Sequence, residues 1–209
     1  STTGWTTCGA APATWSIVDL DAGAGVNNVY QAASSATNGN FSSLQQFTNV
    51  NSALGNFTIT THFKVSDMSN GVAVGLAAFG NTTSLGSTYL ADISATGSIR
   101  IINLGTANAD FVAPTAVLLG GGNITTAKNF TMTFSGTYVG STLNLTFSVT
   151  DGTNSKTILA SDPTPLIGQY FGLRLNNSVA NTDPTVVQFS DYVATTSAVP
   201  LPVATDVPM

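Results

Sequence analysis

The feature that most constrains the fold is a two-residue alternation of apolar and small polar side chains. In residues 57–65, phenylalanine, isoleucine and valine occupy alternate positions, threonine, histidine and lysine occupy the others, and Thr61 is the one polar residue on the apolar side. The same alternation recurs in residues 130–134 and 143–149. Successive side chains of a β-strand point to opposite faces, so the pattern predicts strands that are buried on one face.

Other segments extend this all-β pattern. Residues 72–79 are apolar almost throughout, which predicts a strand buried on both faces or at a sheet centre. Glycine-containing turns are predicted at 95–97 and 151–154, and residues 41–47 are the one segment where we consider a short helix. Further strands are expected at 89–93, 98–104, 155–160, 170–175 and 186–193. We therefore predict an antiparallel β-sandwich, or jelly roll, of about ten strands.

Composition excludes several classes of function. Charged residues make up 7% of the 209 residues, against roughly 25% in an average soluble protein. All ten acidic residues are aspartate, so the glutamate needed by HExxH metalloproteases, Glu/Glu glycosidases and EF-hands is missing. Five basic residues cannot follow a phosphate backbone or an anionic lipid surface, and no apolar stretch is long enough to span a bilayer. We expect neither a nucleic-acid partner nor membrane insertion.

The polar surface must consist of hydroxyls and amides, since the chain has 32 Thr, 21 Ser and 18 Asn. This composition favours a secreted, cell-surface-associated protein. Because residues 1–5 do not look like a signal peptide, we interpret the sequence as a mature or trimmed chain. Lone Cys8 is interpreted as a small buried residue or as a link to another subunit. Seven Asn-x-Ser/Thr sequons permit N-glycosylation: Asn40, Asn56, Asn81, Asn123, Asn129, Asn144 and Asn176.

The chain divides into three segments. Residues 1–20 are predicted to be an extended N-terminal segment, residues 21–193 the β-sandwich domain, and residues 194–209 a Pro-rich, extended C-terminal tail.

Few residues are candidates for chemistry. His62 is the only histidine, lies among threonines and has no Gly-x-Ser-x-Gly partner, so we expect a polar surface residue and no enzymatic activity. Paired aspartates, Asp19 with Asp21 or Asp183 with Asp191, would be needed for an aspartate-only hydrolase. Asp19 and Asp21 fit a calcium site better, because calcium prefers hard oxygen ligands, although turn-forming aspartates are the simpler interpretation. No other cofactor is expected.

Aromatic side chains offer a second type of site, because they can stack on sugar rings or cover the edges of the core. The candidates are Trp5, Trp15, Tyr30, Tyr89, Tyr138, Tyr170 and Tyr192.

Blocks over residues 55–202 resemble a known family. They include Gly75-Leu-Ala-Ala-Phe79 and the segments 57–65, 131–138, 145–152, 165–174 and 187–193. They are similar to secreted, concanavalin A-like (LamG-type) jelly-roll proteins of bacteria that carry a PEP-CTERM surface-sorting signal. Residues 199–202 (Val-Pro-Leu-Pro) resemble the start of that signal, whereas 203–209 do not match its apolar helix and basic cluster. The resemblance implies a surface or biofilm-matrix setting, and permits a calcium ion near the sandwich rim.

Two functions follow as hypotheses. The first is a non-enzymatic structural protein whose copies assemble into a filament or matrix by β-strand addition, with Trp15, Ile17 and Val18 in the donated segment. Three lysines are too few to protect the sheet edges of a monomer, which favours this hypothesis. The alternative is a lectin-like, carbohydrate-binding module of the cell surface or matrix, with extracellular polysaccharide as its partner.

Overall fold

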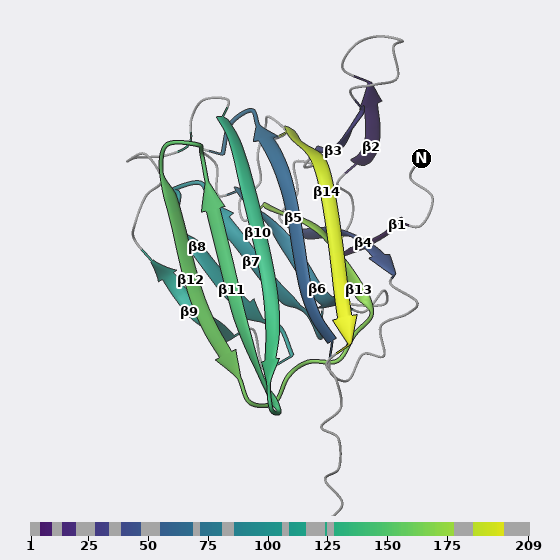
Figure 1. Ribbon diagram of the computed structural model, residues 1–209. Coiled ribbons are helices and arrows are strands. Elements are labelled where there is room, and N and C mark those ends of the chain that lie inside the picture. Colours follow the sequence, from purple (N-terminus) through teal and green to yellow (C-terminus); the bar gives the residue numbers. More distant parts are fainter. Residues whose placement is uncertain are drawn as a thin grey trace, which may run out of the picture.

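Two antiparallel β-sheets pack face to face in the computed structural model (Figure 1). The structure describes residues 5–9, 14–19, 28–33, 39–46, 55–68, 72–80, 86–105, 109–115, 124, 128–177 and 186–198. These residues contain fourteen strands, and no helix among them is long and apolar enough to cross a membrane. The predicted all-β sandwich is confirmed.

Each sheet has seven strands, and their spatial order differs from their order in the chain. From edge to edge, sheet A consists of β1 (Trp5–Gly9), β4 (Gly39–Gln46), β13 (Tyr170–Asn177), β6 (Val72–Gly80), β7 (Tyr89–Ser94), β8 (Ile99–Asn103) and β9 (Ala109–Thr115). Sheet B consists of β12 (Ser155–Asp162), β11 (Thr142–Thr150), β10 (Lys128–Val139), β5 (Gly55–Val65), β14 (Val186–Ala198), β3 (Asn28–Ala33) and β2 (Thr14–Asp19).

The alternation predicted for residues 57–65 is present in β5, where the apolar side chains are buried in the core. The ring of Phe63 stacks on Phe130 of neighbouring β10, with centroids 4.8 Å apart. Thr61 is tolerated on the inner face because its hydroxyl donates a hydrogen bond to the backbone oxygen of Ser190, at 2.9 Å. A buried hydroxyl without such a partner would cost about 1–3 kcal/mol.

Strand β6 lies in the middle of sheet A and is buried along its whole length, as its apolar sequence predicts. Val74 and Leu76 face the main core between the two sheets. Ala77 points the other way and packs with Leu44 and Leu90 in a second, smaller apolar cluster. Sheet A is therefore covered on both faces around β6.

The short helix considered for residues 41–47 is wrong, because residues 39–46 form β4. The strand pairs with β1 on one side and with β13 on the other. Satisfying the backbone hydrogen bonds of two neighbouring strands outweighs the helix-like spacing of Phe41 and Leu44. The alternation pattern also does not predict strands β1, β2, β3 and β9, since their sequences alternate weakly.

The turns predicted at 95–97 and 151–154 are confirmed. Gly97 and Gly152 adopt φ values of 76° and 87°, which glycine reaches without strain. The division into three segments stays a prediction: β1 and β2 belong to the first segment but pair within the sheets, and β14 continues past residue 193.

Candidate functional site

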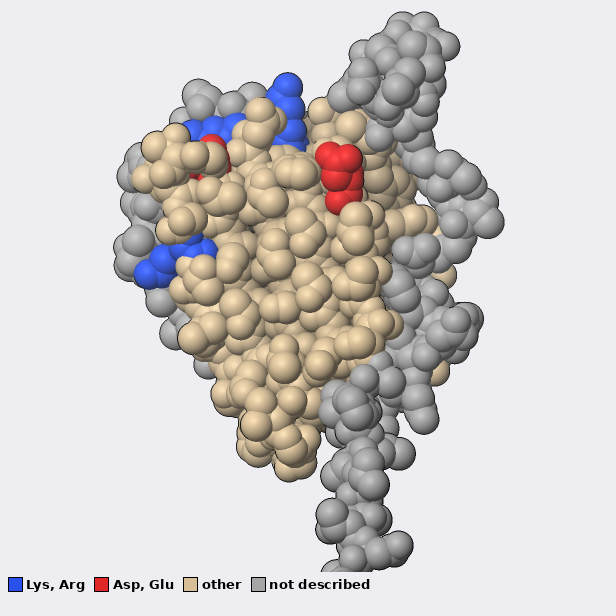
Figure 2. All heavy atoms as spheres, in the orientation of Figure 1, with Lys and Arg blue, Asp and Glu red and all other residues tan. Residues whose placement is uncertain are grey.

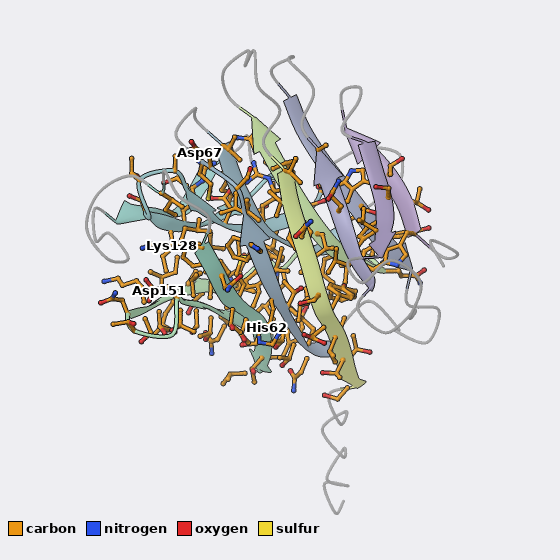
Figure 3. All side chains as sticks on the ribbon, turned by 90° about the horizontal axis from the view of Figure 1, so that it is seen from above. His62, Asp67, Lys128 and Asp151 are labelled. Carbon is orange, nitrogen blue, oxygen red and sulfur yellow. The ribbon has the colours of Figure 1, made fainter. Side chains whose placement is uncertain are left out.

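A groove of about 430 Å³ on sheet B is the candidate binding site. It is formed by β5, β10 and β14 together with the turn between β11 and β12. Its polar lining residues are His62, Lys64, Asn129, Thr131, Thr150, Asp151, Gln188 and Ser190. Figure 3 labels His62 and, at some distance from it, Lys128 and Asp151. Because every wall belongs to a strand or a tight turn, these groups are held on a rigid support.

Two ion pairs flank the groove. The Nδ1 atom of His62 lies 3.1 Å from Asp191 Oδ2, and both side chains are more than half exposed. Asp191 has a φ of 52° beside an irregularity in the pairing of β14 with β5, and its carboxylate lies next to the imidazole. On the opposite side, Lys128 Nζ lies 3.8 Å from Asp151 Oδ2.

Asp151 organises the turn that closes the groove. Its Oδ1 atom accepts hydrogen bonds from the backbone N–H groups of Asn154, at 2.7 Å, and Thr153, at 3.0 Å. These bonds, that of Asn154 foremost, hold the pKa of the Asp151 carboxyl below its usual value, and Lys128 adds a smaller effect in the same direction. The groove wall therefore carries a carboxylate at neutral pH.

The groove suits a ligand rich in hydroxyl groups. Imidazole and amide side chains present donors and acceptors in a plane, and His62, Asn129 and Gln188 bring three such groups together. Phe63 and Phe130 also line the groove, but each is only 2% exposed and their rings stack on each other in the core, so they offer no stacking platform for a sugar. A concave site with a few convergent polar groups is the usual form of a small-ligand site.

Sequence reasoning missed a buried ionic cluster in sheet A. Strand register places Arg174, Gly75, Asp92 and Arg100 next to one another across β13, β6, β7 and β8. Gly75 lacks a side chain, which lets Arg174 reach across β6 to the fully buried carboxylate of Asp92. A Cβ atom at position 75 would lie 2.7 Å from the Cβ of Asp92, too close for real atoms.

Asp92 is shared between two guanidinium groups. Arg100 Nε donates to Asp92 Oδ1 at 2.8 Å and Arg100 Nη2 donates to Oδ2 at 3.3 Å, while Arg174 pairs with Oδ2. Burial lowers the pKa of Arg174 to about 10, which still leaves it charged at neutral pH. Since both oxygens of Asp92 bind cations, this carboxylate is not suited to act as a general base.

A second unpredicted network joins the sheets at one end. Asp162 Oδ2 accepts hydrogen bonds from the Tyr89 hydroxyl at 2.5 Å and from Asn103 Nδ2 at 3.2 Å. Its Oδ1 accepts from the backbone N–H of Thr164 at 2.9 Å, and Leu166 N–H donates to the Tyr89 hydroxyl at 2.9 Å. Burial and, next, the bond to Asp162 raise the pKa of Tyr89. The network connects residues 164–166, which follow β12, with strands β7 and β8.

The calcium site at Asp19 and Asp21 stays a prediction. Asp19 lies at the end of β2, but its side chain is outside the described residues, as is Asp21. Among the side chains that are described, no three His, Cys, Asp or Glu residues gather in a way that would hold a metal ion. Of the other aspartate pair, Asp183 lies outside the described residues and Asp191 contacts His62.

The aromatic candidates act mainly as a border of the core. Trp5, Trp15, Tyr30 and Tyr192 form one half-buried cluster, with neighbouring ring centroids 5.0–5.2 Å apart. This cluster packs against the core, and burial raises the pKa of Tyr192. Tyr89 and Tyr138 are buried and Tyr170 is half-buried, so no candidate ring is exposed as a sugar-stacking surface. Covering the core edge is the interpretation that fits these positions.

The remaining candidates lie in several elements. Trp15, Ile17 and Val18 are in β2, which pairs with β3 of the same chain; the side chain of Ile17 is outside the described residues. Cys8 is in β1, and its side chain is likewise outside the described part. Of the sequons, Asn129 and Asn144 are exposed, Asn56 and Asn176 are partly exposed, Asn40 is described by its backbone alone, and Asn81 and Asn123 lie outside the described residues.

Comparison with known proteins places the fold but not the family. No protein-family model matches the sequence, and no curated protein matches it. Among solved structures, lectin II from Ulex europaeus is similar with a TM-score of 0.58 and 13% identity, covering 93% of both chains. Arcelin-5, a lectin-like defense protein from Phaseolus vulgaris, is similar with a TM-score of 0.52 and 9% identity. The match covers 94% of this chain and 100% of the arcelin chain. An alginate lyase from Klebsiella pneumoniae is similar with a TM-score of 0.50 and 13% identity, and the match covers 87% of this chain and 84% of the lyase chain.

These similarities define the class of fold: a lectin-type jelly-roll sandwich. At identities of 9–13% they establish architecture alone, and both lectins and a lyase share it. Function must therefore be argued from the site.

Proposed function

We propose that the protein is a non-enzymatic carbohydrate-binding module and that its ligand occupies the groove of sheet B. The observation that carries this proposal is the convergence of His62, Asn129 and Gln188 on one concave, rigid surface. A planar amide can bond two neighbouring sugar hydroxyls. The Nε2 atom of His62 can bond one, because Nδ1 pairs with Asp191. Gln188 Nε2 donates one hydrogen bond to Gln31 Oε1, which fixes the orientation of its amide. Similar lectins adopt the same fold, which supports the proposal at the level of architecture.

A binding experiment tests this proposal. The purified protein is screened on a glycan array, and hits are measured by calorimetry for the wild type, Asn129→Ala and Gln188→Ala. We expect each substitution to weaken binding about tenfold, because one lost hydrogen bond costs roughly 1.4 kcal/mol in this range. Asn144→Ala is the matched control: this amide is also exposed on sheet B but lies outside the groove, and affinity should be unchanged. An array without hits, or equal losses in all three variants, would contradict the proposal.

Assembly by strand addition is a second candidate, favoured by the edge strands of sheet B, which have no further partner among the described residues. Among the described strands, β2 forms one edge and β12 the other, and each pairs with a single neighbour. A contact between β12 of one copy and β2 of another would be head-to-tail, and such a contact extends into a filament when the rotation between copies does not close a ring. Because β2 already pairs with β3, a donated strand would have to leave that position.

Truncation of residues 1–20 tests assembly. If strand donation builds a polymer, light scattering and negative-stain microscopy should show filaments for the full chain and monomers for the truncated chain, with β-sheet circular dichroism retained. A full chain that is monomeric at all concentrations, or a truncated chain that still polymerises, would contradict assembly by strand donation.

The setting of the protein is proposed from composition and resemblance. We infer a place on the cell surface or in an extracellular matrix, with polysaccharide as the partner. We also propose that the protein is related to LamG-type, PEP-CTERM-sorted proteins, that Asp19 and Asp21 bind calcium, and that the sequons are N-glycosylated.

A further inference from the structure

The outer face of sheet B carries a regular array of hydroxyl groups, which we call the hydroxyl grid. Strand pairing aligns five strands, β14, β5, β10, β11 and β12, in rows that cross the sheet. The rows are Thr195–Thr58–Ser135–Thr146–Leu159, Val193–Thr60–Thr133–Ser148–Thr157 and Ser190–His62–Thr131–Thr150–Ser155. Twelve of these fifteen positions are threonine or serine, and all fifteen side chains are exposed or partly exposed.

The grid contains no Asp, Lys or Arg. Figure 2 shows the same face: it is a broad uncharged surface, with the visible charged side chains toward its upper and left borders. The three positions without a hydroxyl are Leu159, Val193 and His62. A charged ligand therefore finds no counter-charge within the grid.

Cross-strand contacts hold the hydroxyls in place. The hydroxyl of Thr60 lies 3.3 Å from that of Thr133, and Ser148 and Thr157 hydroxyls lie 2.8 Å apart. β-branched threonine has few rotamers, which adds to the rigidity of the array. The grid is thus a pre-ordered set of donors, acceptors and methyl groups with little side-chain entropy to lose on binding.

The spacing of the grid is set by β-sheet geometry. Neighbouring strands lie about 4.8 Å apart, and alternate residues along one strand lie about 6.7 Å apart. Hexagonal ice presents water oxygens on its surfaces with repeats of similar length in two directions. Sheet twist rotates adjacent strands by about 20°, so the matching region is centred on β10 and β11, where all three grid positions of each strand carry a hydroxyl.

We propose that the hydroxyl grid binds the surface of ice. A neutral lattice of fixed hydroxyls interspersed with methyl groups can order a layer of water in register with the crystal. Polysaccharide is a poorer occupant of this face, because no aromatic side chain is exposed among the described residues and the amide groups lie mainly in the groove. Four grid residues, His62, Thr131, Thr150 and Ser190, also line the groove, whereas the other two rows lie outside it. Ice binding is therefore tested at these two rows, with a ligand other than carbohydrate.

Ice affinity is the property to measure. The wild-type protein is partitioned between a growing ice hemisphere and solution, and thermal hysteresis and inhibition of ice recrystallisation are measured at micromolar concentration. We expect enrichment in the ice and inhibition of recrystallisation. Thr133→Lys places a long, hydrated charge in the middle of the grid and should raise the inhibitory concentration at least tenfold. Ser141→Lys, in the exposed β10–β11 turn, adds the same charge outside the grid and should behave as wild type.

Further variants keep the test independent of folding and of the groove. Thr133→Val preserves the shape of the side chain and its β-propensity but removes the hydroxyl, and should reduce inhibition partially; circular dichroism verifies that each variant is folded. Gln188→Ala should leave ice binding unchanged. A wild type excluded from ice, or a folded Thr133→Lys that retains full activity, would overturn the inference.

Discussion

Replacing Asp92 with alanine is expected to lower the free energy of unfolding by about 3–5 kcal/mol, the range for breaking a buried ion pair. Arg174 has a side chain that is only 3% exposed and would keep its charge without the carboxylate that compensates it. Arg100 would lose its two hydrogen bonds to Asp92 as well, but its side chain is 26% exposed and can be hydrated. The burial of Arg174 is therefore what makes the loss large.

Urea unfolding followed by tryptophan fluorescence and far-UV circular dichroism measures the change. Asp191→Ala is the matched control, because this carboxylate is exposed and paired with exposed His62, and it should change stability by less than about 1 kcal/mol. The double variant Asp92→Ala/Arg174→Met should regain part of the loss, since it removes the uncompensated charge. An Asp92→Ala protein as stable as the control would refute the assigned role of the cluster.

The second large effect is expected for Asp162→Ala, at about 3 kcal/mol of lost stability. This substitution removes the acceptor of the Tyr89 hydroxyl and of the Asn103 amide, both of which are buried. Each buried donor left unpaired costs about 1–3 kcal/mol. The backbone N–H of Thr164 also loses its acceptor, but it is only partly buried and can turn to water.

Hydrogen exchange locates this effect in the molecule. In Asp162→Ala the amides of Thr164 and Leu166 should exchange faster, because the connection between β12 and β13 loses its anchor on β7 and β8. Tyr89→Phe should show the same pattern with a smaller loss of about 1–2 kcal/mol. Ser161→Ala, an exposed neighbour on the same strand, is the control and should behave as wild type. Unchanged exchange at Leu166 in Asp162→Ala would contradict the anchoring role.

Local pattern was sufficient for the core strands. The alternation in β5, β10 and β11, the apolar run of β6 and the glycine turns at Gly97 and Gly152 all follow from properties of neighbouring residues. Strand β4 escapes such prediction because its stability comes from two partners that are distant in sequence, β1 and β13. Its own residues do not encode those partners in any periodicity.

The candidate sites were less accessible to sequence reasoning. His62 is correctly placed on the polar face of β5, but the groove also requires Asn129 from β10 and Gln188 from β14. The ionic cluster depends on Gly75 lying between Arg174 and Asp92 across three strands. No local signal identifies such an arrangement, because strand order and register decide which residues become neighbours.

The sequence by itself determined the class of the fold and the chemistry of its surface. Alternating threonine and apolar residues require strands with one buried face, and the scarcity of charge leaves hydroxyls and amides to meet the solvent. Only the tertiary structure decided where these groups gather: the groove, the hydroxyl grid and the two buried networks arise from non-local strand pairing. Side-chain periodicity is a property of the chain, whereas register is a property of the assembled sheet.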